Sequence, residues 1–434
     1  MVAVPRRRMP DGTASAHLYV PKFATVLREG YRASDLRADA IAGLTVAVVA
    51  LPLSMAIAVG SGVSPERGLY TAIVGGFVVS ALSGSRFQIG GPAGAFIVLV
   101  SAAVARFGIE GLLLITLMSG ALLVAAGLLR IGSLIRHIPH AVTVGFTCGI
   151  ATTIFASQIK DLAGLKLAGP EPAALAPKFA ALGAALPSLN PSALGLGAAT
   201  AAAIFVLRKT RPGWPGMLIA LTAAAALAAL LGLHVDTIGS RFGGIPRSFP
   251  MPHMPKADLP QIVALLPTAL AFTLLGGVES LLSAKVADGM TARRHRSNME
   301  LVGQGAANIA SALFGGFSVT GTIARTATNV RAGGRTPVSG MLHALFLLAF
   351  VLVAAPLASF IPLCALAGVL VTVCWTMAEK AEFVRLLSHR RTAAVLLATF
   401  GLTLARDLTS GIIAGCLLAA VLAMLKRPLP EEGA

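Results

Sequence analysis

Charged residues are scarce in this sequence. They make up 12% of its 434 residues, whereas a soluble globular protein carries about 25%. Hydrophobic residues make up 56%, and the mean hydropathy is +0.82. A chain with so few charges cannot cover the surface of several water-soluble domains, so part of its apolar surface must face lipid. Composition therefore excludes a soluble protein and indicates an integral membrane protein.

Cysteine is also rare, and its placement excludes a disulfide framework and a thiolate metal site. The four cysteines lie inside apolar stretches, without a CxxC motif or cysteine–histidine spacing: Cys148, Cys364, Cys374 and Cys416. Small buried hydrophobes in helices are the simplest interpretation. The histidines form no cluster, and no nucleophile–base pair is present. We therefore expect no metal and no cofactor, and a membrane enzyme is the least favoured class.

Apolar stretches follow one another almost to the end of the chain. They predict an all-α polytopic membrane protein with about fourteen spans, at 39–60, 67–83, 90–106, 110–129, 140–159, 192–208, 214–232, 260–286, 299–315, 319–332, 337–356, 361–378, 392–405 and 408–425. Several are shorter than the roughly 20 residues of a perpendicular transmembrane helix. The short ones are expected to be half-helices or to lie buried among their neighbours.

Positive charge alternates between the connections and predicts the orientation. Residues 1–38 lack the apolar core of a secretory signal and form an expected cytosolic arm. If this arm is cytoplasmic, the even-numbered connections should be basic, and they carry Arg86, Arg130, Arg136, Arg208, Lys209, Arg211, Arg293, Arg294, Arg296, Arg331, Arg335, Arg385, Arg390 and Arg391. The positive-inside rule places both termini in the cytoplasm of the cell (inner) membrane. The net charge of +17 thus reflects topology, and no nucleic-acid partner is expected.

Glycine and proline interrupt corresponding spans in the two halves of the chain. The first half has Pro52 in its first span and the run 88–95 at the start of its third, and the second half has Gly276-Gly277 and the run 315–322 in the same places. Seven spans per half is an odd number, so the halves should form inverted repeats. Paired interruptions of this kind indicate a transport site at the membrane midplane.

Half-helices that start at Pro92 and near Val319 would point their N-termini at this site. Such N-termini carry unpaired amides and about half a positive charge each, which favours a bound anion. Glycines let the backbone approach a ligand, threonine hydroxyls donate to it, and an arginine one turn further adds positive potential. The expected substrate-binding residues are Gly91, Pro92, Ala93, Gly94, Ser318, Val319, Thr320, Gly321, Thr322 and Arg325.

One carboxylate, Glu279, lies in an otherwise uncharged apolar stretch. A charge there costs on the order of 3 kcal/mol on insertion scales, and it is functional by default. We expect a proton or Na⁺ site at Glu279, with Ser283 one turn away. The alternative is a structural ion pair with Arg325 or Lys285. Coupling is favoured because importing a dianion against 100 mV costs roughly 4.6 kcal/mol.

Many ordered motifs resemble the sulfate permease family, the SulP or solute carrier 26 group of anion transporters. The matching motifs include Leu51-Pro52-Leu53-Ser54, Gly90-Gly91-Pro92, Glu279-Ser280-Leu281-Leu282-Ser283, Asp288-Gly289-Met290-Thr291, Gly303-Gln304-Gly305 and Val319-Thr320-Gly321-Thr322-Ile323-Ala324-Arg325-Thr326. Together they cover the chain from about residue 36 to residue 426.

The resemblance implies two intertwined seven-span repeats that form a core domain (39–129 and 260–356) and a gate domain (130–259 and 357–426). The substrate would lie between spans 3 and 10 and cross the membrane by an elevator movement of the core. It also implies a homodimer. Family members usually carry a STAS domain after the last span, whereas residues 427–434 are expected to be a short cytosolic tail without one.

The sequence departs from the family at the expected site. Many relatives have a hydroxyl residue at the position of Ala93 and proline at Ser318, and plant- and animal-like sulfate carriers often have glutamine at Leu53. Sulfate, dicarboxylate and bicarbonate therefore remain open as substrates of a coupled secondary transporter. An anion channel and a nucleobase permease on the same architecture are the alternatives.

Overall fold

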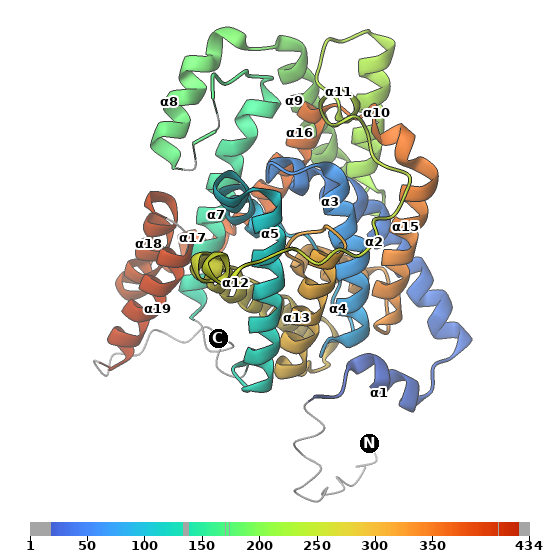
Figure 1. The fold of residues 1–434 in the computed structure, drawn as a ribbon, viewed down its shortest axis with the longest axis vertical. Coiled ribbons are helices and arrows are strands. Elements are labelled where there is room, and N and C mark those ends of the chain that lie inside the picture. The colour runs from blue at the N-terminus through green and yellow to red at the C-terminus, as the bar shows by residue number, and fades with distance from the viewer. Residues whose placement is uncertain (1–18, 133–138, 170, 173, 407, 425–434) are drawn as a thin grey trace, which may run out of the picture.

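The structure is a computed structural model, and it describes residues 19–132, 139–169, 171–172, 174–406 and 408–424. Figure 1 shows that the regular structure of these residues is almost entirely helical. The expectations for residues 1–18, for Arg136 and for the tail 427–434 lie outside the described residues.

The elements of the first half alternate long helices with short turns. They are α1 (Lys22–Glu29), α2 (Ala33–Gly60), α3 (Pro65–Tyr70), a π-helical turn (Thr71–Gly75), α4 (Gly76–Leu82), β1 (Gly90–Gly91), a 3₁₀ turn (Gly94–Phe96), α5 (Ile97–Leu128), α7 (His140–Leu162), α8 (Leu175–Ala185), a 3₁₀ turn (Leu186–Ser188), α9 (Pro191–Thr210), α10 (Gly216–Leu230) and α11 (Ile238–Phe242).

The second half repeats the long helices and contains the second short strand. Its elements are α12 (Leu259–Thr291), α13 (Ser297–Leu313), β2 (Thr320–Gly321), α14 (Ile323–Arg331), α15 (Val338–Ala358), α16 (Leu363–Met377), α17 (Lys380–Leu387), α18 (Arg390–Ala405) and α19 (Leu408–Met424).

Among the described residues, seven helical segments are long and apolar enough to cross a membrane: Ala33–Gly60, Gly94–Leu128, His140–Leu162, Pro191–Thr210, Leu259–Thr291, Val338–Ala358 and Leu363–Leu387. Two shorter apolar helices cover Gly216–Leu230 and Ser410–Leu422. The expected all-α class is therefore confirmed, and the longer segments have the length and composition of membrane spans. The expected spans 90–106 and 110–129 are separated only by a break at Gly108, whose φ is 69°.

Some boundaries differ from the expected ones. The first long helix begins at Ala33, inside the stretch expected to be the arm, and the arm itself contains α1. The connection between the expected spans 140–159 and 192–208 contains α8, which sequence patterning did not indicate. The apolar residues of α8 pack on the end of α7 in a small cluster of Ala163, Leu165, Leu182 and Ala185, so tertiary contact stabilises this helix.

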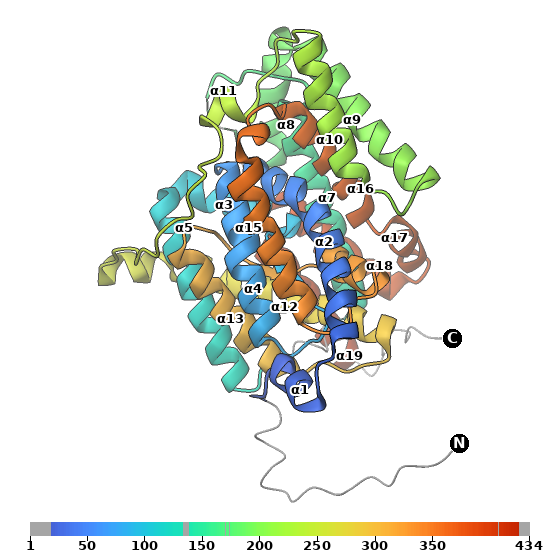
Figure 2. The ribbon, with the colours of Figure 1, turned by 90° about the vertical axis from the view of Figure 1, so that its right-hand side faces the viewer.

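The helices pack in two groups. One group contains α2, α4, α5 and α12 to α15, and the other contains α7, α9, α10, α16, α18 and α19. Helix α2 belongs to the first group but also contacts α16 and α10 of the second. Figure 2 shows α15 between α2 and α4, so elements of the two sequence halves alternate within the first group.

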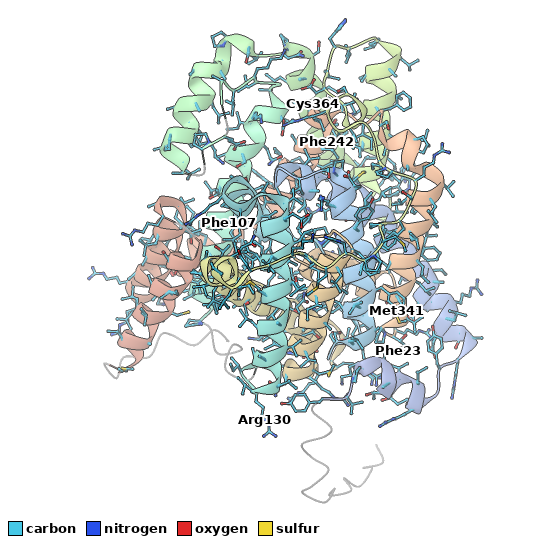
Figure 3. All side chains as sticks on the ribbon, viewed as in Figure 1. Phe23, Phe107, Arg130, Phe242, Met341 and Cys364 are labelled. Atoms are coloured by element: carbon cyan, nitrogen blue, oxygen red, sulfur yellow. The ribbon has the colours of Figure 1, made fainter. Side chains whose placement is uncertain are left out.

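One close crossing joins α5 and α13. A Cβ atom at Gly305 would lie 2.4 Å from the Gly120 carbonyl oxygen, so only glycine allows the two backbones to approach so closely. Small residues at such crossings are typical of helices that pack in a membrane. Figure 3 shows the two ends of the molecule, with Phe242 and Cys364 toward one end and Phe23 and Arg130 toward the other.

Candidate functional site

The two glycine-rich interruptions meet in the interior of the first helix group. They form an antiparallel pair in which Gly90 lies opposite Gly321 and Gly91 opposite Thr320. The amide of Thr322 donates to the carbonyl of Ile89 at 3.1 Å, which extends the pairing by one bond. Non-helical backbone at membrane depth needs such internal partners because lipid offers none. The pair therefore holds together two segments from opposite halves of the chain.

Both helices after the pair begin later than the sequence indicated. The 3₁₀ turn that leads into α5 begins at Gly94 instead of Pro92, and α14 begins at Ile323 instead of near Val319. The residues before them, Ala93 and Thr322, are extended (ψ 144° and 128°) and provide no side-chain cap. The physical reason is the strand pairing, which keeps the backbone extended through Pro92.

The two uncapped N-termini leave backbone amides available to a ligand. The start of α14 is open, because Ile323 is 39% exposed and Ala324 is also exposed. At the start of the other helix, a Cβ atom on Gly94 would lie 3.2 Å from the Met377 sulfur of α16 and 3.8 Å from Ile154 of α7. The candidate site therefore lies where the first helix group contacts the second.

Arg325 is buried behind β1, with 1% of its surface exposed. Its Nη2 donates to Ser54 Oγ at 3.1 Å and to the Pro92 carbonyl at 3.4 Å, and its Nη1 donates to the Gly90 carbonyl at 3.5 Å. Its Nε has no hydrogen-bond partner among the described residues. The guanidinium thus carries a full positive charge next to the uncapped helix start, without a carboxylate partner among the residues that the structure describes.

Glycine is required on both strands because side chains lie directly against them. A Cβ at Gly91 would be 1.6 Å from Arg325 Nη1, and a Cβ at Gly321 would be 1.4 Å from Gln88 Nε2. Each strand is thereby covered by a side chain from the other half of the chain. The sequence predicted close backbone approach at Gly91 and Gly321, and the structure shows protein side chains there.

The hydroxyls of the expected site residues fall into two kinds. Thr320 Oγ1 donates to the Gly276 carbonyl at 3.3 Å and ties β2 to α12. Ser318 Oγ and Thr322 Oγ1 are buried and have no hydrogen-bond partner among the described residues. A buried polar atom without a partner is unusual and calls for a ligand or a water. Val319 lies between these groups, and its amide donates to Asn308 Oδ1 at 3.1 Å.

Glu279 is not paired with a cation within the described part of the chain. Its Oε2 is buried without a partner, and the ion pairs found among the described residues do not include Glu279. The alternative of a structural pair with Arg325 or Lys285 is therefore wrong for this structure, because Arg325 turns toward β1 instead. Ser283 lies one turn away on α12, but its hydroxyl donates to Thr326 Oγ1 at 3.1 Å.

Sequence reasoning assigned no role to several residues that hold the site together. They are polar side chains buried at the strands, namely Ser54, Gln88, Glu300, Gln304, Asn308, Thr326 and Asn329. Asn329 donates to the Phe87 carbonyl at 2.9 Å, and Thr326 accepts from the Ile89 amide at 3.2 Å. A sequence pattern in α13 could have identified some of them. Glu300, Gln304 and Asn308 follow one another at four-residue intervals, which places them on one face of the helix.

The helix α1 closes one end of the first helix group. Its Glu29 forms an ion pair with Arg86 at 2.5 Å, and the hydrogen bond from Arg86 lowers the pKa of Glu29. The Lys22 amide donates to the Ser83 carbonyl at 3.0 Å. Burial, with the nearby charges of Arg296 and Arg86, lowers the pKa of the Lys22 ammonium to about 8.

Residues 36–399 match the Sulfate permease family. The chain is 42% identical over 91% of its length to the putative sulfate transporter YvdB of Bacillus subtilis, of which it covers 74%. It is 32% identical over 77% of its length to the bicarbonate transporter BicA of a Picosynechococcus strain, of which it covers 60%.

Solved structures show the same fold. The transmembrane domain of a cyanobacterial bicarbonate transporter BicA aligns with a TM-score of 0.79 and 30% identity, covering 88% of this chain and 98% of that one. The murine Slc26a9 anion transporter in its inward-facing state aligns with a TM-score of 0.86 over 97% of this chain and 74% of that one, at 15% identity. These matches confirm the resemblance seen in the motifs, and the relatives are named as transporters and not as enzymes. This chain belongs to the sulfate permease family of membrane transport proteins.

Proposed function

We propose that this protein is a secondary active transporter of a small anion of the sulfate, dicarboxylate or bicarbonate class, coupled to H⁺ or Na⁺. The observation that carries the proposal is the arrangement around the β1–β2 pair. Two uncapped helix N-termini, the buried Arg325 and the hydroxyls of Ser318 and Thr322, for which the described residues provide no hydrogen-bond partner, lie together there. Positive potential and free donors at one buried point favour an anion.

The ten expected substrate-binding residues have different roles in this proposal. The amides that follow Pro92, Ala93 and Gly94 and the amide that follows Thr322 contact the anion, while Gly91 and Gly321 leave room for the side chains that lie against them. Arg325 acts mainly through its charge, because its Nη atoms are already bonded to the protein. Thr320 and Val319 position β2 through Gly276 and Asn308. The hydroxyls of Ser318 and Thr322 are the side-chain donors that remain for the substrate.

The driving ion binds at Glu279 in this proposal, with Ser283 beside it. An ionised carboxylate without a partner is costly in a membrane interior. A proton or Na⁺ removes that cost. Glu279 Oε2 has no partner within the part of the chain that the structure describes, which supports a cation site. Coupling also supplies the roughly 4.6 kcal/mol needed to import a dianion against 100 mV.

The proposed architecture has fourteen spans in two inverted seven-span repeats, with half-helices at spans 3 and 10. The core domain (39–129 and 260–356) corresponds to the first helix group, and the gate domain (130–259 and 357–426) to the second. The core carries the substrate by an elevator movement, and the protein is a homodimer in the cell membrane with both termini cytoplasmic. The separation of Phe23 and Arg130 from Phe242 and Cys364 supports this orientation.

The test is uptake by proteoliposomes that contain the full chain. Labelled sulfate, succinate, fumarate and bicarbonate are offered with and without a Na⁺ gradient and a pH gradient, and empty liposomes give the background. Saturable, gradient-driven accumulation of one of these anions is expected. Uptake that does not saturate and never exceeds equilibrium would instead identify a channel. Uptake of a nucleobase with none of the anions would overturn the substrate class.

A further inference from the structure

A chain of buried polar side chains lies behind β2, on the side away from Arg325. Its members share almost complete burial, with at most 2% of each residue exposed: Gln88, Ser280, Glu300, Gln304 and Asn308. They come from the segment before β1, from α12 and from α13. The first and last of these side chains contact β2 or the residue before it: Gln88 lies against Gly321, and Asn308 accepts a hydrogen bond from the Val319 amide. The chain therefore links α12 and α13 to the strand.

Hydrogen bonds fix the orientation of both glutamine amides. Gln88 Nε2 donates to Ser280 Oγ at 2.8 Å and to the Ser280 carbonyl at 3.3 Å. Gln304 Nε2 donates to the carbonyl of Val319, so Gln304 Oε1 is the atom that faces Ser280. Ser280 Oγ lies 3.1 Å from Glu300 Oε1 and 3.2 Å from Gln304 Oε1.

The Ser280 hydroxyl has one hydrogen and faces two acceptors. If Glu300 is ionised, the hydrogen goes to Glu300, and Gln304 Oε1 is left without a donor. If Glu300 is protonated, its O–H donates to Ser280 Oγ, which still accepts from Gln88, and the Ser280 hydrogen goes to Gln304. A hydroxyl accepts two hydrogen bonds and donates one. Only the protonated acid therefore satisfies Ser280 and Gln304 together.

Glu300 has no ion-pair partner among the described residues. Its Oε2 has no hydrogen-bond partner among the described residues, and the backbone groups of Gly84 and Ser85 are the polar neighbours of the carboxyl group besides Ser280. His295, which acts on it electrostatically, is bonded to Asp288 at 2.7 Å. An unpaired buried carboxylate normally takes up a proton.

Charged groups on the neighbouring elements are few. Helix α4 has no titratable side chain. The charged residues of α5, Arg106 and Glu110, lie beside its break at Gly108, while the Asn298 end of α13 packs on Gly127. Helix α12 carries Glu279, Lys285 and Asp288. Arg296, one turn before Glu300, donates to the Val20 carbonyl and to Thr25 Oγ1.

We propose that Glu300 is a proton-binding site whose proton sets the hydrogen bonds that hold Val319 and the substrate strand β2. With the proton bound, Ser280 donates to Gln304 and the Gln304 amide is held against Val319. When the proton leaves, the Ser280 hydrogen returns to Glu300 and Gln304 loses its donor. The O–H bond of Glu300 breaks and the proton passes to water. The link to transport rests on the proposed function, whereas the protonation of Glu300 does not.

The first test is infrared spectroscopy of the purified full chain in lipid. The carbonyl stretching band of a protonated carboxylic acid is expected at neutral pH. Because Glu279 can contribute to this band, Glu279→Gln is the background variant. A protonated-acid band that remains in Glu279→Gln and is lost in the Glu279→Gln/Glu300→Gln double variant supports the proposal. A band of equal strength in the single and double variants overturns it.

Two further variants keep the test decisive if Glu300→Gln does not fold. Ser280→Ala removes the acceptor of the Glu300 proton, so the band of Glu300 is expected to shift. Thr273→Val is the matched control, because Thr273 lies on the same helix as Ser280 but is not one of the five buried polar residues. This variant should leave the band in place. An unshifted band in Ser280→Ala overturns the proposal.

The second test measures coupling to the substrate. The thermal stabilisation of the protein by an added anion is followed across acidic and mildly alkaline pH. The amide introduced by Glu300→Gln donates like the protonated acid but cannot titrate, so this variant should lose a pH dependence that Glu279→Gln retains in part. An identical pH dependence in wild type and Glu300→Gln overturns the link to β2. Absence of anion transport would contradict the proposed function alone, since the infrared result needs no transported ion.

Discussion

Gly91 lies directly against the guanidinium of Arg325, and a Cβ atom there would be 1.6 Å from Nη1. The two residues come from opposite halves of the chain, and their contact places a buried positive charge beside the uncapped start of the helix at Gly94. Because the side chain of Arg325 is anchored to Ser54 and to the carbonyls of Gly90 and Pro92, it cannot move aside without losing several hydrogen bonds.

Gly91→Ala should therefore displace Arg325 and abolish high-affinity anion binding. Thermal unfolding and uptake are measured on the same preparation, and a lower melting temperature is also expected. Gly289→Ala is the matched control. A Cβ at Gly289 meets nothing within 4 Å, and alanine is favoured over glycine in a helix by up to about 1 kcal/mol. Normal uptake by Gly91→Ala would contradict the assigned role of this contact.

Arg325→Lys should separate the charge of Arg325 from its geometry. Lysine retains the positive potential but cannot reproduce the forked donors, so we expect a lower melting temperature with part of the anion affinity retained. Arg325→Gln, which is neutral, should raise the half-saturation concentration by roughly tenfold or more, equivalent to about 1.4 kcal/mol. Equal affinities of the two variants would show that charge is not the contribution of Arg325.

Thr322→Val and Thr326→Val form a matched pair. Thr322 Oγ1 has no hydrogen-bond partner among the described residues, so its removal should change the free energy of unfolding by less than about 0.5 kcal/mol while weakening anion uptake. Thr326 Oγ1 accepts from the Ile89 amide, and leaving that buried amide unpaired costs about 1–3 kcal/mol. Denaturation in detergent and uptake kinetics test both. Unchanged kinetics in Thr322→Val would remove this hydroxyl from the site.

Glu279→Gln should uncouple the anion from its driving ion. The amide preserves shape and hydrogen bonding but can neither take up a proton nor offer a full negative charge to Na⁺. Exchange of labelled anion at equal concentrations should survive, and accumulation driven by an imposed pH or Na⁺ gradient should be lost. Glu110→Gln, an exposed position beside the break in α5, is the control for the loss of one negative charge. Gradient-driven accumulation in Glu279→Gln would exclude this carboxylate as the coupling site.

The pH dependence of stability should contain a contribution from Lys22. Its pKa is lowered from 10.5 to about 8 in the folded protein, so between these values the unfolded state binds more protons. Stability therefore rises with pH across this window, where the unfavourable buried charge is relieved. The difference in melting temperature between wild type and Lys22→Met should shrink as pH rises from 8 to 10.5. A constant difference would contradict the lowered pKa.

The sequence determined the class of the protein, the approximate helices and the two interruptions at 88–95 and 315–322. These features depend on local composition, because an apolar stretch of sufficient length can only satisfy its backbone in lipid as a helix. Glycine and proline weaken a helix locally, but the expected interruptions at Pro52 and at Gly276-Gly277 are wrong, since α2 and α12 continue through them. The family was also visible in its motifs. The expectation that the ligand is an anion came from the N-termini of the predicted half-helices, which are local features as well.

Only the tertiary structure determined how the two interrupted segments pair and where the helices after them begin. The pairing of Gly90 with Gly321 joins segments from opposite halves, and it delays both helix starts in a way no local pattern indicates. It also decided that Arg325 bonds to β1 and not to Glu279, and that Ser280 lies between Glu300 and Gln304. These contacts bridge residues far apart in the chain, so they depend on how the helices pack, whereas hydropathy and propensity describe only near neighbours.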